Sequence, residues 1–337
     1  MARTTFLTLA VMILCVGADA QISESERRHE ESDIAKIVAI TRADHSTIFF
    51  TGLIGGGYVR DGDVSMLTSD SGDFYSRPEC YGSAVSRDGS RFAYAAPSSG
   101  PTACRIVLHD LGTGEEKPLA ETGLRPHPMS WSWDDSEIVY QAADGIVAVS
   151  IADGTKHIVG RLPLRINGKI PTEGWQLFSI ERFHRRPELM LDAMVCIPTR
   201  EPGTCEQQRQ VLLLSSDDSR VLEMGANAAV SPAGDSIAFF AKNGVVVVDA
   251  DGSNRRVVTH AASTLFFLPF LKEESWTTIV WSPGGERLWF NTIIDEGGNT
   301  DAYLVDVKRG RRRQILRHSM IIITAWRASI HADSSLR

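Results

Sequence analysis

The stretch 230–260, "VSPAGDSIAFFAKNGVVVVDADGSNRRVVTH", decides the fold, because the same order of residues returns later in the chain. Residues 279–316 repeat it as "IVWSPGGERLWF" followed by "TDAYLVDVKRGRRRQIL". Such self-similarity is the signature of a repeat architecture. Each copy has a serine or threonine at one anchor position: Thr41, Ser86, Ser132, Ser231 and Ser282. Successive anchors are 45, 46, 99 and 51 residues apart. Because 99 is about twice the other steps, we expect a degenerate copy near position 181 and six repeats in all.

Each copy contains the pattern of four short strands. A first apolar strand enters a turn rich in Ser, Pro, Asp and Gly, which favour turn conformations. A second strand such as "SIAFFA" (236–241) and a third such as "GVVVVDAD" (244–251) follow, and a tight turn leads to a more polar fourth strand. Short β-branched strands separated by turns are typical of antiparallel all-β proteins. Four strands per copy predict a six-bladed β-propeller of four-stranded antiparallel blades over residues 36–326.

The remaining segments lie at the two ends of the chain. Residues 1–20 have a basic start, an apolar run and a small-x-small cleavage pattern, which predict a secretory signal peptide. We expect residues 21–35 to form a charged, solvated arm with one helix over 23–36, and residues 327–337 to form a tail. Segments 33–41 and 319–329 both have strand patterns. One of these two strands is expected to complete a blade begun at the other terminus.

Composition narrows the classes of function. Hydrophobic residues make up 43% of the chain and charged residues 23%, as in soluble globular proteins. The net charge is −7, so the chain lacks the overall positive charge that attracts nucleic acid. After signal cleavage no apolar segment is long enough to span a bilayer. The sequence therefore predicts a periplasmic or secreted protein without a nucleic-acid partner or a transmembrane segment.

Four cysteines follow the signal: Cys80, Cys104, Cys196 and Cys205. An even number of cysteines in an exported chain is compatible with disulfides. Cys196 and Cys205 flank a Pro- and Gly-rich loop, and a bond between them would contribute roughly 2–3 kcal/mol to stability. Cys80 and Cys104 are either a second pair or reduced, buried thiols. The spacings match no familiar zinc set, and we expect no metal or other cofactor.

Here the chain resembles a known family, the TolB-like β-propeller repeat, with its cadence "SPDG…IAF…IYVMDADGSN…LT". The resemblance rests on three pairs of segments: Val230–Phe239 with Val245–Thr259, Val85–Tyr94 with Leu108–Gly114, and Trp281–Phe290 with Tyr303–Gly310. It extends over about 36–318 and implies an exported propeller, without implying a particular pathway.

The predicted topology divides the connections between two faces. Turns from first to second and from third to fourth strands are short, and they define the short-turn face. Links between second and third strands and between blades define the long-loop face. These links are long and irregular: 52–63, 97–104, 160–174, 196–205, 260–275 and 293–300. Variable loops on a rigid scaffold usually carry binding, so we expect the long-loop face to be the specialised one.

The candidate partner-binding residues belong to two of these loops or their flanks: Leu265, Phe266, Phe267, Phe270 and Trp276, with Arg165 and Lys169. The apolar group either folds back against the propeller or forms a patch for a partner. Arg165 and Lys169 are candidates for binding a carboxylate or phosphate, with plain solvation as the alternative.

No catalytic set is expected from the residue patterns, since the nine histidines show no metalloprotease or comparable spacing. Trp131, Trp281 and Trp289 recur with the repeat and are expected to pack between blades. We therefore expect a non-catalytic exported propeller that binds a protein or cell-envelope component through its long-loop face. The alternative is an enzyme that processes a polysaccharide or peptide in the central funnel.

Overall fold

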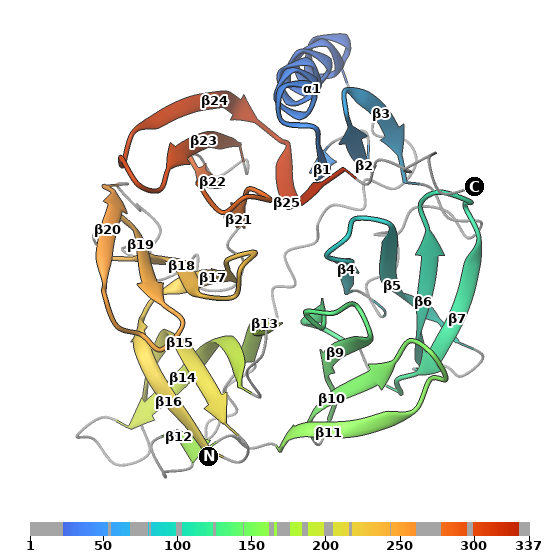
Figure 1. Ribbon diagram of the computed structural model, residues 1–337, viewed down its shortest axis with the longest axis vertical. Coiled ribbons are helices and arrows are strands. Elements are labelled where there is room, and N and C mark those ends of the chain that lie inside the picture. The colour runs from blue at the N-terminus through green and yellow to red at the C-terminus, as the bar shows by residue number, and fades with distance from the viewer. Residues whose placement is uncertain are drawn as a thin grey trace, which may run out of the picture.

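The computed structural model describes residues 23–329 apart from 53–54, 68–79, 81, 99–102, 124–125, 144, 162–164, 167–175, 184–187, 199–204, 216–217, 243, 261–277 and 295–298. Across these described ranges the strands form six sheets, which stand around a common axis (Figure 1). The chain is a six-bladed β-propeller, and the prediction of its fold is confirmed.

We number the blades along the ring and give the strands of each from the axis outward. Blade 1 contains β25 (Ile322–Ala328), β1 (Ser46–Gly52), β2 (Gly55–Arg60) and β3 (Asp63–Met66). Blade 2 contains β4 (Ser83–Val85), β5 (Arg91–Pro97), β6 (Cys104–Asp110) and β7 (Glu116–Glu121). Blade 3 contains β8 (Met129–Trp131), β9 (Glu137–Gln141), β10 (Gly145–Ser150) and β11 (Lys156–Arg161).

Blade 4 contains β13 (Gln176–Arg182), β14 (Leu189–Pro198), β15 (Cys205–Ser215) and β16 (Asp218–Met224), with the short β12 (Arg165–Ile166) parallel to β16 at the outer edge. It is the degenerate copy expected near position 181. Blade 5 contains β17 (Ala226–Val230), β18 (Ser236–Ala241), β19 (Gly244–Asp249) and β20 (Arg256–Thr259). Blade 6 contains β21 (Ile279–Trp281), β22 (Arg287–Ile293), β23 (Thr300–Asp306) and β24 (Arg312–Ser319).

The two ends of the ring meet in blade 1. The C-terminal strand β25 pairs antiparallel with β1, with Ser46 opposite Ala328 and Ile48 opposite Trp326. Segment 319–329 is therefore the closing strand, as one of the two alternatives predicted. β25 extends to Ala328, two residues into the segment that we expected to be a tail.

The other alternative, a strand over 33–41, is wrong, because this segment belongs to helix α1 (Glu24–Asp44). Ser23 and Glu26 form a capping box that starts the helix. Ile34, Ile37 and Ile40 are spaced by three residues, so they share one helix face, which is buried against blades 1 and 6. Within the described part of the expected arm, Glu30, Asp33 and Ile34 are buried, whereas residues 23–29 are exposed to solvent.

The anchor serines explain why the same sequence pattern recurs. Their Oγ atoms accept a hydrogen bond from the amide five residues ahead, which fixes the turn between the first two strands of a blade. The distances are 2.9 Å at Ser86 and Ser132, 3.1 Å at Ser231 and 3.0 Å at Ser282. Thr41 lies within α1, so it is not an anchor.

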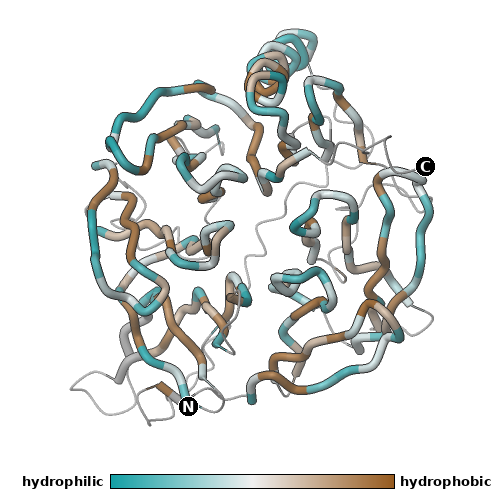
Figure 2. The backbone as a smooth tube through the Cα atoms, in the orientation of Figure 1, coloured by the Kyte–Doolittle hydropathy of each residue, from teal (hydrophilic) through white to brown (hydrophobic). Residues whose placement is uncertain are grey.

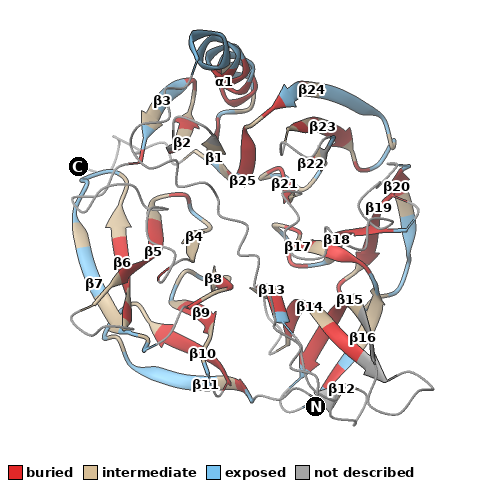
Figure 3. Cartoon of the chain, turned by 180° about the vertical axis from the view of Figure 1, so that it is seen from behind, coloured by how far each residue is buried: buried red, intermediate tan, exposed pale blue. Residues whose placement is uncertain are grey.

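The core lies between neighbouring blades. The Trp131 indole donates to the Ala84 carbonyl of blade 2 at 2.9 Å, and the Trp281 indole donates to the Ala229 carbonyl of blade 5 at 3.0 Å. Trp289 is fully buried between blades 6 and 1. The tryptophans therefore pack between blades, as predicted. Hydrophobic and buried residues concentrate on the inner and middle strands, while outer strands such as β11 and β24 are largely hydrophilic and exposed (Figures 2 and 3).

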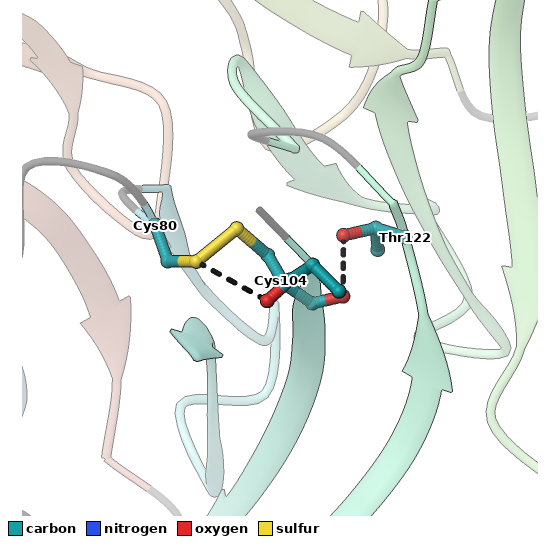
Figure 4. The surroundings of a disulfide bond; sticks show 4 residues. Cys80, Cys104 and Thr122 are labelled. Atoms are coloured by element: carbon teal, nitrogen blue, oxygen red, sulfur yellow. Dashed lines mark hydrogen bonds between the residues drawn. A yellow bond between two sulfur atoms is a disulfide. The ribbon is translucent and has the colours of Figure 1, made fainter. Parts of the chain in front are cut away.

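A disulfide between Cys80 and Cys104 joins the segment before β4 to the start of β6 (Figure 4). This pair is therefore bonded rather than reduced. Thr122 Oγ1 also donates to the Cys104 carbonyl at 2.9 Å. Cys196 is disulfide-bonded as well, and the side chain of its candidate partner Cys205 lies outside the described residues. Within the described ranges, no helix is long and apolar enough to cross a membrane.

Candidate functional site

Four charged side chains and one tryptophan meet around the propeller axis at the short-turn face. We call this group the axial cluster, and its members are Arg87, Trp133, Asp135, Glu181 and Arg327. Each lies near the end of an inner strand or in the turn that follows one, and these strands surround the axis (Figure 1). The cluster brings together residues from blades 1, 2, 3 and 4.

Arg87 spans the ring. Its guanidinium leaves the β4–β5 turn of blade 2 and donates to the carbonyls of Ser231 and Pro232 in blade 5, on the opposite side (Figure 1). The same guanidinium stacks on the Trp133 ring of blade 3, 5.0 Å from its centroid. The Trp133 indole also donates to the Pro232 carbonyl at 3.5 Å. One arginine thus joins three turns across the axis.

Neighbouring blades are joined by the other members of the cluster. The Asp135 carboxylate accepts from the backbone amides of Arg87 and Asp88, at 2.8 and 3.1 Å, which ties blade 3 to blade 2. Arg327 Nε donates to the Ser86 carbonyl at 3.2 Å, which ties blade 1 to blade 2.

Between blades 4 and 5 the same kind of tie is made by Glu181, whose Oε2 accepts from the Val230 amide at 2.9 Å. At the short-turn face, side chains therefore bind the backbone of adjacent and opposite blades.

Burial changes the protonation of the cluster. It raises the pKa of Glu181 to about 7, although the Val230 amide and the charges of Arg327 and Arg87 act in the opposite direction. Burial, reinforced by Arg327, lowers the pKa of Arg87 to about 10. Burial also raises the pKa of Asp135 and lowers that of Arg327. Glu181 can therefore exchange a proton near neutral pH.

The residues that the sequence singled out lie elsewhere in the chain. Outside the described residues are Leu265, Phe266, Phe267, Phe270, Trp276 and Lys169. Arg165 contributes its backbone to β12, at the outer edge of blade 4, and its side chain is not among those described. In the described part of the chain, the structure brings none of these candidate side chains together.

The axial cluster was missed because its turns were interpreted only as repeated structure. A usable signal was present at the position after the anchor serine. Two copies have proline there, Pro232 and Pro283, whereas blades 2 and 3 have Arg87 and Trp133. Both departures from the repeat belong to the cluster. Among the described residues, no group of three or more His, Cys, Asp or Glu is arranged to hold a metal ion.

No protein-family model and no curated protein matches the sequence. Solved structures do resemble it. TolB from Acinetobacter baumannii is 14% identical, with a TM-score of 0.55 over 89% of this chain and 72% of that one. An oligogalacturonate lyase in complex with manganese is 17% identical, with a TM-score of 0.47 over 70% of this chain and 65% of that one. Prolyl endopeptidase is 14% identical, with a TM-score of 0.45 over 89% of this chain and 48% of that one.

The similarity to TolB confirms the resemblance to TolB-like propellers at the level of the fold. Fold alone does not determine activity.

Proposed function

We propose that this protein is an exported, non-catalytic β-propeller that binds a protein or cell-envelope component through its long-loop face. The observation that carries the proposal is that the charged residues of the axial cluster are already hydrogen-bonded within the propeller. Arg87, Asp135, Glu181 and Arg327 each bond to the backbone of another blade. A ligand on the axis at the short-turn face would have to break these bonds, whereas the longest connections of the chain belong to the opposite face.

Two further features support this proposal. Closure of the ring by β25 and the Cys80–Cys104 disulfide give the loops a rigid base. A disulfide also supports a periplasmic or secreted location, because disulfides persist in oxidising compartments.

The test compares two triple variants of the full chain. One replaces Phe266, Phe267 and Phe270 by serine in the long loop 260–275. The matched control replaces Val64, Ile158 and Met224 by serine. These three are apolar and 46%, 52% and 58% exposed on outer strands. The measurement is co-sedimentation of each purified variant with the envelope fraction of the producing cells.

We expect the phenylalanine variant to bind the envelope fraction at least about tenfold more weakly, since apolar anchors of an interface dominate its affinity. The control variant should bind as the parent protein does. Undiminished binding of the phenylalanine variant, or equal loss in both variants at unchanged melting temperature, would refute the long-loop assignment.

One feature favours the alternative of a funnel enzyme: burial near the axis raises the pKa of the Glu181 carboxyl group to about 7. A carboxyl group that titrates near the working pH is suited to general acid–base catalysis. Cleavage of oligosaccharides or peptides by the parent protein, lost in Glu181→Gln with binding retained, would favour this alternative.

A further inference from the structure

A second site lies away from the axial cluster, between α1 and blade 6. It is a cavity of about 340 Å³. The N-terminal half of α1 forms one wall, and Asn299 together with the end of β24 and the link to β25 forms the other. Because β22–β23 and β24–β25 are connections of the long-loop face, the cavity belongs to that face.

Asp33 is the unusual residue of this cavity. Its side chain is completely buried and lines the cavity wall. Oδ1 accepts from Lys36 Nζ at 2.8 Å. Oδ2 is buried and accepts no hydrogen bond from the described part of the protein.

His29 does not satisfy that oxygen. Its Nε2 lies 3.6 Å from Asp33 Oδ2 and 3.2 Å from the Arg317 carbonyl. A carbonyl oxygen only accepts, so the Nε2 proton is donated to Arg317. A buried carboxylate oxygen without a donor is costly. The wall of the cavity therefore contains an acceptor suited to a donor from outside the chain.

Two more carboxyl groups line the cavity. Glu30 is 3% exposed and stands three residues before Asp33 on the same face of α1, and Glu26 lines the cavity nearer the helix start. No lysine or arginine is among the described residues of the lining. Lys36 occupies only the Oδ1 side of Asp33, and Glu26 adds another carboxyl group to the lining. This arrangement favours a positively charged ligand.

We propose that this cavity binds a primary alkylammonium group. An ammonium carries three N–H donors, one of which satisfies Asp33 Oδ2. The volume of about 340 Å³ is at the lower end of small-molecule sites, so it suits an organic cation on a short chain rather than a bare ion. Met320 also lines the cavity and offers an apolar surface to the alkyl carbons.

Two sources carry this chemistry, a free diamine and the lysine side chain of a peptide. Binding of free amines does not depend on the partner assigned to the long-loop face. This inference and the proposed function therefore succeed or fail separately.

The test is calorimetric titration of the full chain with 1,5-diaminopentane and with Nα-acetyl-lysine amide, and 1,5-pentanediol is the uncharged control. We expect at least one amine to bind with a Kd of about 1 mM or lower, and the diol to show no binding. Tighter binding of the diamine would identify a free amine as the ligand. Tighter binding of the lysine amide would identify a lysine side chain.

The matched variants are Asp33→Asn and Glu31→Gln. Both lie on α1, but Glu31 is exposed and does not line the cavity. Asp33→Asn should weaken amine binding at least about tenfold, and Glu31→Gln should leave it unchanged. If Asp33→Asn fails to fold, Glu30→Gln replaces it with the same expectation.

Three results would overturn the proposal. The first is no heat of binding from either amine up to about 10 mM. The second is binding that both variants retain in full. The third is binding of Ca²⁺ or Zn²⁺ alone that the amines do not displace, which would make this a metal site.

Discussion

Arg87 crosses the propeller axis and donates to two carbonyls of blade 5, the blade opposite its own. Each charge-assisted hydrogen bond is worth about 1.5–3 kcal/mol, and stacking on Trp133 adds to it. We expect Arg87→Ala to lower the free energy of unfolding by about 2–3 kcal/mol. Urea unfolding followed by tryptophan fluorescence measures this change. Arg309→Ala is the control, since the Arg309 side chain is 71% exposed. Equal stability of the two variants would show that the bonds from Arg87 to blade 5 do not stabilise the fold.

Glu181 makes the stability of the protein depend on pH. The unfolded carboxyl group titrates near 4.5 and the folded one near 7, so between these values the folded state binds more protons than the unfolded state. The contribution of Glu181 to the free energy of unfolding therefore falls as the pH rises from about 4.5 to 7, and it is constant above that range. Glu181→Gln removes the titration and keeps an acceptor for the Val230 amide.

The stability gained by Glu181→Gln should thus grow between pH 4.5 and pH 7 by on the order of 2–3 kcal/mol. Urea unfolding of both proteins across this range measures it. Parallel stability profiles would mean that Glu181 is not desolvated in the folded state.

At the scale of elements, the strand β25 is the part of the chain on which the ring depends. It inserts Trp326, 1% exposed, between blades, and the indole donates to Ser46 Oγ at 2.9 Å. Burial of one tryptophan is worth about 3–5 kcal/mol, a large share of the stability of a domain. A chain ending at Ser319 should therefore lose its cooperative thermal transition.

A chain ending at Ser329 is the matched control for this truncation, because it keeps β25 whole. Circular dichroism should show its melting temperature close to that of the full chain. If the chain ending at Ser319 melts as the control does, β25 is not the closing strand.

The elements differ in how far local sequence determined them. The blade turns were predictable because their chemistry is local, from each anchor serine to the amide five residues ahead. Helix α1 was predictable only in its first half. The apolar run after Asp33 suits a strand or a helix, and its burial against blades 1 and 6 decides between them. The repeat pattern marked Arg87 and Trp133 as unusual, but their contacts could not be predicted, because Arg87 and Pro232 are 145 residues apart and meet only when the ring has formed.

At the scale of the whole molecule, the two faces of the propeller have different characters. The short-turn face repeats one turn and bonds its charged residues to neighbouring blades. The long-loop face carries the links between blades and the cavity beside α1. A self-bonded end opposite an end with long connections is compatible with the binding scaffold that we propose.

The most direct test of the proposed binding surface is site-specific photo-crosslinking in cells that produce the chain. A photo-reactive phenylalanine is placed at Ala143 or Lys242, both exposed on the long-loop face, or at Thr113 or Ala233, both exposed on the short-turn face. If the long-loop face binds the partner, envelope components should crosslink to Ala143 and Lys242, and none should crosslink to Thr113 and Ala233. Crosslinks that arise only from Thr113 and Ala233 would contradict it, and would place the binding surface at the short-turn face.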